Sequence, residues 1–128
     1  MMKMKLNRKM ALVAMLGLST LSMGVLAHGP SKAKHGGIVQ TAGDLSFELV
    51  PQGESAALYV VDHDKPADVS KMGGKLTVLN GTAKSEAELK AGSGNKLEAA
   101  TKLGPGARVV ATVNTAAGKA ITVRFNLK

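Results

Sequence analysis

A β-strand that runs into a polar turn is written most clearly in the stretch Leu58-Tyr59-Val60-Val61-Asp62-His63-Asp64-Lys65-Pro66. Its first four residues are aliphatic or aromatic, and two of them are β-branched, which favours a strand. A turn is expected next, because Asp side chains bond to the nearby backbone and Pro66 has no N–H to donate to a sheet ladder. A histidine and two carboxylates stand at this end of the strand. The stretch therefore predicts a β-fold and a candidate metal site together.

Short apolar runs separated by turn residues continue along the chain. Apolar and polar residues alternate over residues 45–49 and 121–127, as in half-buried strands, and Asn80-Gly81 is a strong hairpin signal. About seven or eight short antiparallel strands, with turns every 8–12 residues or so, predict an all-β fold, a small sandwich or barrel. The residues expected to point into its core are Phe47, Leu49, Val60, Val78, Val109, Val123 and Phe125.

For two segments the sequence allows a helix as an alternative to a strand or a loop. Residues 85–90 contain Glu, Ala, Leu and Lys, which favour a helix, although the preceding Asn-Gly and the following glycines favour a hairpin. Residues 68–74 are expected to form a linker, in which Asp68 could cap a single helical turn.

The first 27 residues have the order of a cleavable signal peptide. Four cations precede an apolar stretch over residues 11–26, and the small residues around Ala27 suit a cut after it. The stretch is slightly short for a membrane-spanning helix of about 20 residues, so an uncleaved anchor is the less favoured alternative. We therefore expect a signal peptide (residues 1–27), a flexible N-terminal arm (residues 28–36) and a single β-domain (residues 37–128). The expected location is the periplasm, with no permanent membrane anchor.

Composition excludes several classes of function. The chain has no cysteine, so disulfides, thiolate ligands and Cys nucleophiles are all excluded. Residues 28–128 hold 13 Lys and Arg against 9 Asp and Glu, a net charge of +4, and these cations are spread singly. With one Tyr, two Phe and no Trp, a nucleic-acid partner is not expected. The sequence also lacks a Gly-x-Ser-x-Gly elbow and a phosphate-binding loop, so we predict that the protein is not an enzyme.

Three histidines, His28, His35 and His63, are the candidate metal ligands, with Asp62 as an oxygen donor beside the third. Neutral imidazole suits copper, zinc and nickel, although each histidine taken alone is better explained as an ordinary surface residue. We expect His63 and Asp62 to be rigid ligands at the strand end, with His28 and His35 supplied by the arm. Cleavage after Ala27 would give His28 a free amine that chelates Cu(II) together with its ring. Such a site resembles the N-terminal histidine site of periplasmic copper-resistance sandwich proteins.

The tripeptide His35-Gly36-Gly37 precedes the first expected strand. Two glycines in succession permit a positive φ or a close approach of the backbone to a ligand or another strand. A simple flexible entry to the sheet explains them equally well.

Four short motifs resemble the N-terminal periplasmic segment of heavy-metal efflux adaptor (membrane-fusion) proteins, and especially small stand-alone exported relatives of that segment. The motifs are His35-Gly36-Gly37, Phe47-Glu48-Leu49, Tyr59-Val60-Val61-Asp62 and Lys65-Pro66. The likeness covers roughly residues 35–79, and the long hairpin and lipoyl-like parts of a full adaptor are absent from this sequence. It implies a periplasmic β-domain for handling copper, zinc, cobalt or nickel in heavy-metal resistance. A divalent metal or copper ion would be its ligand, and components of an efflux system would be its partners. The alternative is a non-catalytic interaction module of the envelope that binds no metal and uses an exposed edge strand.

Overall fold

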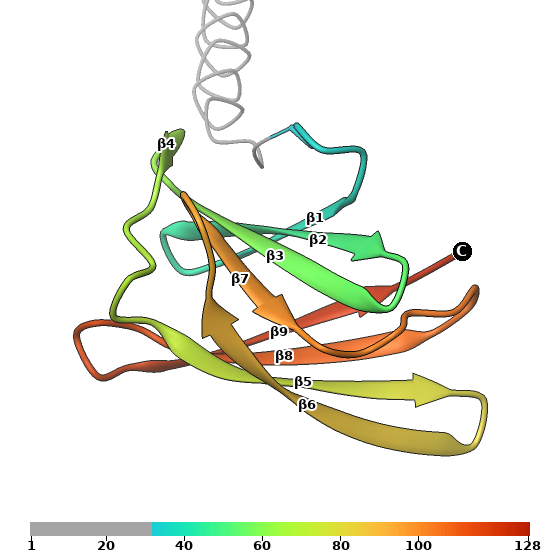
Figure 1. Ribbon diagram of the computed structural model, residues 1–128. Helices are drawn as coiled ribbons and strands as arrows, with labels where there is room; N and C mark the ends of the chain where they lie inside the picture. The colour runs from blue at the N-terminus through green and yellow to red at the C-terminus, as the bar shows by residue number, and fades with distance from the viewer. Residues whose placement is uncertain (1–31) are drawn as a thin grey trace, which may run out of the picture.

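Antiparallel β-strands make up all the regular structure in the computed structural model, which describes residues 32–128 (Figure 1). The expected signal peptide, His28 and the first part of the arm lie outside the described residues. Within this range no helix is long and apolar enough to cross a membrane. The strands are β1 (Ile38–Ala42), β2 (Leu45–Gln52), β3 (Ser55–Asp62), β4 (Lys65–Pro66), β5 (Gly73–Asn80), β6 (Ala83–Ala91), β7 (Lys96–Ala99), β8 (Arg108–Asn114) and β9 (Ala120–Asn126).

One nine-stranded sheet contains them all in the order β1-β2-β3-β7-β6-β5-β8-β9, with β4 added to β3. The two end strands, β1 and β9, lie against each other, so the sheet is nearly closed into a barrel (Figure 1). The predicted all-β sandwich or barrel is therefore confirmed.

The core fills the inside of this sheet. On β8, for example, Val109, Ala111 and Val113 are buried, as expected when alternate residues of a strand point to one face. Leucines from several strands pack beside the aromatic rings. All seven residues predicted for the core are buried, namely Phe47, Leu49, Val60, Val78, Val109, Val123 and Phe125.

The two segments for which the sequence left a helical alternative, residues 68–74 and 85–90, contain no helix. Residues 85–90 lie in β6, which pairs with β5 across the predicted Asn80-Gly81 turn, where Gly81 has a φ of 64°. In the linker, Asp68 accepts a hydrogen bond from the Ser70 N–H at 3.0 Å. This local bond makes a turn in place of a helix cap.

The strand-then-turn prediction for the opening stretch is confirmed. His63 and Asp64 have φ values of 52° and 67° and form a two-residue turn between the paired residues Asp62 and Lys65. Two successive positive φ values are typical of the tight hairpin turn that matches strand twist. The short return strand β4 was not predicted, and it ends at Pro66.

Candidate functional site

A buried carboxylate, that of Glu48, holds the segment that precedes β1. Its neighbours Phe47 and Leu49 point into the core, so Glu48 points to the opposite face of β2, where only 5% of the residue is exposed. Its Oε1 accepts a hydrogen bond from the Lys34 N–H at 3.0 Å. Its Oε2 accepts two more at 2.8 Å, from the N–H groups of His35 and Gly37. The carboxylate thus binds three backbone amides of one short segment.

These contacts lower the pKa of Glu48 below its ordinary value. Burial alone raises the pKa, but the backbone N–H groups of Lys34, Gly37 and His35, together with the His35 ring, lower it by more. Glu48 is therefore an ionised carboxylate at neutral pH, and it can only accept hydrogen bonds.

The two glycines of this segment have separate roles. Gly36 has a φ of 75°, and a Cβ atom on Gly37 would lie 2.3 Å from the carbonyl oxygen of Leu49. Two successive glycines permit a positive φ or a close approach of the backbone, and the structure shows one of each.

The imidazole of His35 is oriented on two sides. Its Nδ1 lies 3.2 Å from Oε1 of Glu48, and its ring is stacked on Tyr59 with centroids 3.7 Å apart. Because an ionised carboxylate only accepts, the Nδ1–H group donates to it, and in the neutral ring this tautomer leaves the lone pair on Nε2. The side chain is still 40% exposed, so the ring is fixed without being buried.

A cavity of about 240 Å³ adjoins the ring. Lys32, Lys34 and His35 line one part of it, and residues of β1, β2, β3 and β4 together with Asn95 line the rest. Asn95 donates its side-chain N–H to the Val60 carbonyl at 2.8 Å, which attaches this residue to β3. A volume of this size admits several water molecules or a small hydrated ion.

A second carboxylate–histidine pair lies at the turn between β3 and β4. Nδ1 of His63 is 2.5 Å from Oδ1 of Asp62, with side-chain exposures of 73% and 53%. Both described histidines therefore have Nδ1 beside a carboxylate, the arrangement that commonly orients a histidine whose other nitrogen binds a metal.

The two histidines have different neighbours in the structure. His35 contacts Glu48 and Tyr59, whereas His63 contacts Asp62 at an exposed turn. Within residues 32–128, no group of three or more His, Asp or Glu side chains is placed to hold a metal ion. His28 lies outside the described residues, so the ligand set expected from the sequence stays a prediction.

Glu48 is the site residue that the sequence analysis missed, because strand alternation placed it on a solvent-facing side. Two features of the sequence could have pointed to Glu48. It lies between Phe47 and Leu49 in one of the four motifs, and the His-Gly-Gly motif, which covers it in the structure, is another of the four. Neither motif shows the contact by itself.

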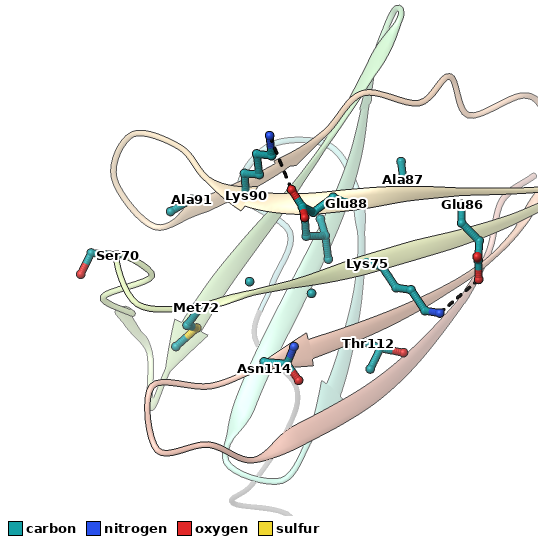
Figure 2. Close-up of a pocket in the computed structure, with 13 residues that line it drawn as sticks. Ser70, Met72, Lys75, Glu86, Ala87, Glu88, Lys90, Ala91, Thr112 and Asn114 are labelled. Atoms are coloured by element: carbon teal, nitrogen blue, oxygen red, sulfur yellow. Dashed lines mark ion pairs between the residues drawn. The ribbon is translucent and has the colours of Figure 1, made fainter.

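A wider hollow of about 790 Å³ lies on the outer face of β5, β6 and β8 (Figure 2). Two ion pairs lie along it, Lys75–Glu86 at 3.2 Å between β5 and β6 and Lys90–Glu88 at 3.5 Å within β6, and each joins exposed side chains. Its lining contains no histidine, so it offers no imidazole to a metal ion.

No protein-family model matches this chain, and no curated protein or solved structure is detectably similar to it. The geometry around Glu48 and His35 is therefore the main support for a function.

Proposed function

We propose that the protein is an exported, non-catalytic metal-binding protein whose oriented ligand is Nε2 of His35. The observation that carries this proposal is the Glu48–His35 pair, with the imidazole stacked on Tyr59. A carboxylate behind a ligating histidine fixes its tautomer and raises the basicity of the nitrogen that faces the metal. Copper, zinc, cobalt and nickel all accept imidazole nitrogen.

One imidazole does not make a tight site, so further donors are needed. Processing after Ala27 would supply the amine and the ring of His28, seven residues before His35. A chain of seven residues spans up to about 25 Å when extended, which is ample for closure onto His35. Two imidazoles and an amine form the nitrogen-rich set that Cu(II) prefers.

The geometry favours His35 over His63 as the anchor. Both the backbone and the ring of His35 are held by Glu48, whereas His63 lies on an exposed turn and its ring contacts one neighbouring carboxylate. A fixed ligand loses less conformational entropy when the metal binds. The Asp62–His63 pair remains the second candidate, because its carboxylate orients the ring in the same way.

The periplasmic location and a role in heavy-metal efflux and resistance belong to this proposal as well. They are supported by the signal-peptide pattern and by the resemblance of the four motifs to efflux adaptor segments.

Calorimetric titration of the protein that begins at His28, with Cu(II) and with Zn(II), tests the proposal. We expect His35→Ala to abolish tight binding and the matched His63→Ala to retain it, while removal of residues 28–31 weakens it. Loss of binding in His63→Ala alone would move the anchor to the turn. Equal affinity in all the variants would leave the interaction-module alternative in front.

A further inference from the structure

One edge of β6 has no strand partner over most of its length. Residues 83–89 pair with β5 on one side, whereas β7 pairs with the other side only at Lys90 and Ala91. Figure 1 shows β6 along the lower margin of the molecule, turning toward β7 only at its C-terminal end. Within residues 32–128, no other strand pairs with residues 83–89 on the side away from β5.

The direction of the free backbone groups follows from the β5–β6 hairpin. Asn80 and Ala83 are directly opposed next to its two-residue turn. The residues that flank such a turn exchange both hydrogen bonds, and bonding then alternates along the ladder. Odd-numbered residues of β6 therefore bond to β5, and even-numbered residues direct their N–H and C=O groups to the open edge.

The β6–β7 turn supports this assignment. The N–H of Gly92, an even-numbered residue, donates to the Lys96 carbonyl at 2.7 Å on the β7 side. The open edge therefore presents the backbone groups of Lys84, Glu86 and Glu88, which have no strand to bind within the described chain.

There is room beside this edge for another strand. Where β6 separates from β7, a cavity of about 560 Å³ opens between them. Its lining is mostly small, with charged side chains around it, and consists of Ser55, Glu86, Ala87, Glu88, Lys90, Ala91, Glu98, Ala99 and Ala100.

The charges along the edge complement a second copy of the same strand. If two β6 strands pair antiparallel about a two-fold axis at Ser85, then Lys84 of each copy lies opposite Glu86 of the other. Ala83 then faces Ala87, and these small residues allow close approach. Opposite charges placed directly across an antiparallel pair are stabilising, and an isologous contact repeats the pair twice.

Charged side chains often protect a free edge, and a row of one sign would prevent self-pairing. Here the row contains both signs, and a two-fold axis at Ser85 brings Lys84 of one copy opposite Glu86 of the other. We propose that two copies of this protein associate through the open edge of β6, in the register centred on Ser85, and so continue the β5–β6 sheet across a dimer axis.

A charge exchange at the edge tests the proposal by sedimentation equilibrium, measured in EDTA so that no metal can bridge the histidines. The wild type should show a monomer–dimer equilibrium. Lys84→Glu alone and Glu86→Lys alone should each weaken dimerisation by about tenfold, because each puts two like-charged pairs across the axis. An equimolar mixture of the two variants should restore dimerisation, since every opposed pair then joins one Lys to one Glu.

Recovery of dimerisation in the mixture would also show that both variants are folded. Glu86→Lys removes the contact of Glu86 with Lys75, but that pair is exposed and contributes little to stability. Lys119→Glu, in the exposed turn between β8 and β9, makes the same charge change away from β6 and should leave dimerisation unchanged. A monomeric wild type at all concentrations, or a mixture that does not recover, would overturn the proposal.

Discussion

The imidazole ring of His35 lies parallel to the phenol ring of Tyr59, with 3.7 Å between the ring centroids and 5° between the planes. His35 belongs to the segment before β1, and Tyr59 lies in the middle of β3. The stack therefore attaches that segment to the sheet, and Glu48 on the intervening strand β2 binds the same segment through its backbone. An aromatic ring and a buried carboxylate thus both attach the segment before β1 to the sheet.

The stack should protect the amides that bind Glu48. In Tyr59→Ala, amide hydrogen exchange at Lys34, His35 and Gly37 should be faster than in the wild type, because the segment opens more often. Tyr59→Phe keeps the ring and should exchange like the wild type. NMR-detected exchange measures all three amides, and unchanged protection in Tyr59→Ala would show that the stack does not hold the segment.

Glu48→Gln should destabilise the fold by about 1–3 kcal/mol at neutral pH, since one carboxylate oxygen is replaced by a donor facing a donor. The loss should depend on pH. The pKa of Glu48 in the folded state lies below its ordinary value of about 4.5, so its stabilising contribution is complete above that pH. The contribution is lost as the pH falls through the lowered pKa.

Urea unfolding of the wild type and of Glu48→Gln from pH 7 to pH 3 measures this effect. The wild type should lose its advantage over the variant as the pH falls below about 4.5. Glu88→Gln, at an exposed residue of β6, is the matched control and should change stability by less than about 0.5 kcal/mol. A constant difference between the wild type and Glu48→Gln at every pH would contradict the proposed charge state.

Gly36→Ala and Gly37→Ala separate the two glycine roles. Ala at Gly36 has space but must adopt a φ of 75°, which costs about 1 kcal/mol. Ala at Gly37 would place its Cβ against the Leu49 carbonyl, which should cost about 1–3 kcal/mol and move the N–H away from Glu48. Chemical denaturation of both variants compares the costs. A larger loss for Gly36→Ala would reverse the assignment.

Local patterns in the sequence predicted the strands well, because alternation with a period of two is a property of each strand by itself. Residues 45–49 predicted β2 and placed Phe47 and Leu49 in the core. The same alternation placed Glu48 toward solvent, and there it failed, since the cover comes from His35, 13 residues away. Alternation shows which side a residue faces, and it contains no information about which distant segment lies on that side.

The candidate site was predictable only in its parts. His35, His63 and Asp62 were chosen from their chemistry, and both histidines do lie beside carboxylates. The sequence could not show that His35 and His63 would have separate partners, because that follows from the path of β1 to β4. The strand β4 was missed for a related reason, since two residues ending in Pro66 give too short a pattern to read as a strand.

Phe125→Ala should cost about 3–5 kcal/mol, because the ring is 1% exposed and its removal leaves a cavity in the core. Arg124→Ala, on the opposite face of β9, should change stability by less than about 0.5 kcal/mol. Thermal or urea unfolding of the two variants compares them. A loss below about 1 kcal/mol in Phe125→Ala would show that the last strand packs differently against the core.

The two carboxylate–histidine pairs allow a matched test of where a metal binds. If Nε2 of His35 is the ligand, Glu48→Gln should lower the affinity for Cu(II) by about 10–100-fold, because the carboxylate no longer fixes and polarises the ring. Asp62→Asn makes the equivalent change behind His63 and should leave the affinity unchanged. Competition against a chromophoric chelator at pH 7 measures the Cu(II) affinity of both variants. Urea unfolding at the same pH checks that each variant is folded. The reverse result, with Asp62→Asn weak and Glu48→Gln normal, would place the metal at the turn between β3 and β4, because only His63 depends on that carboxylate.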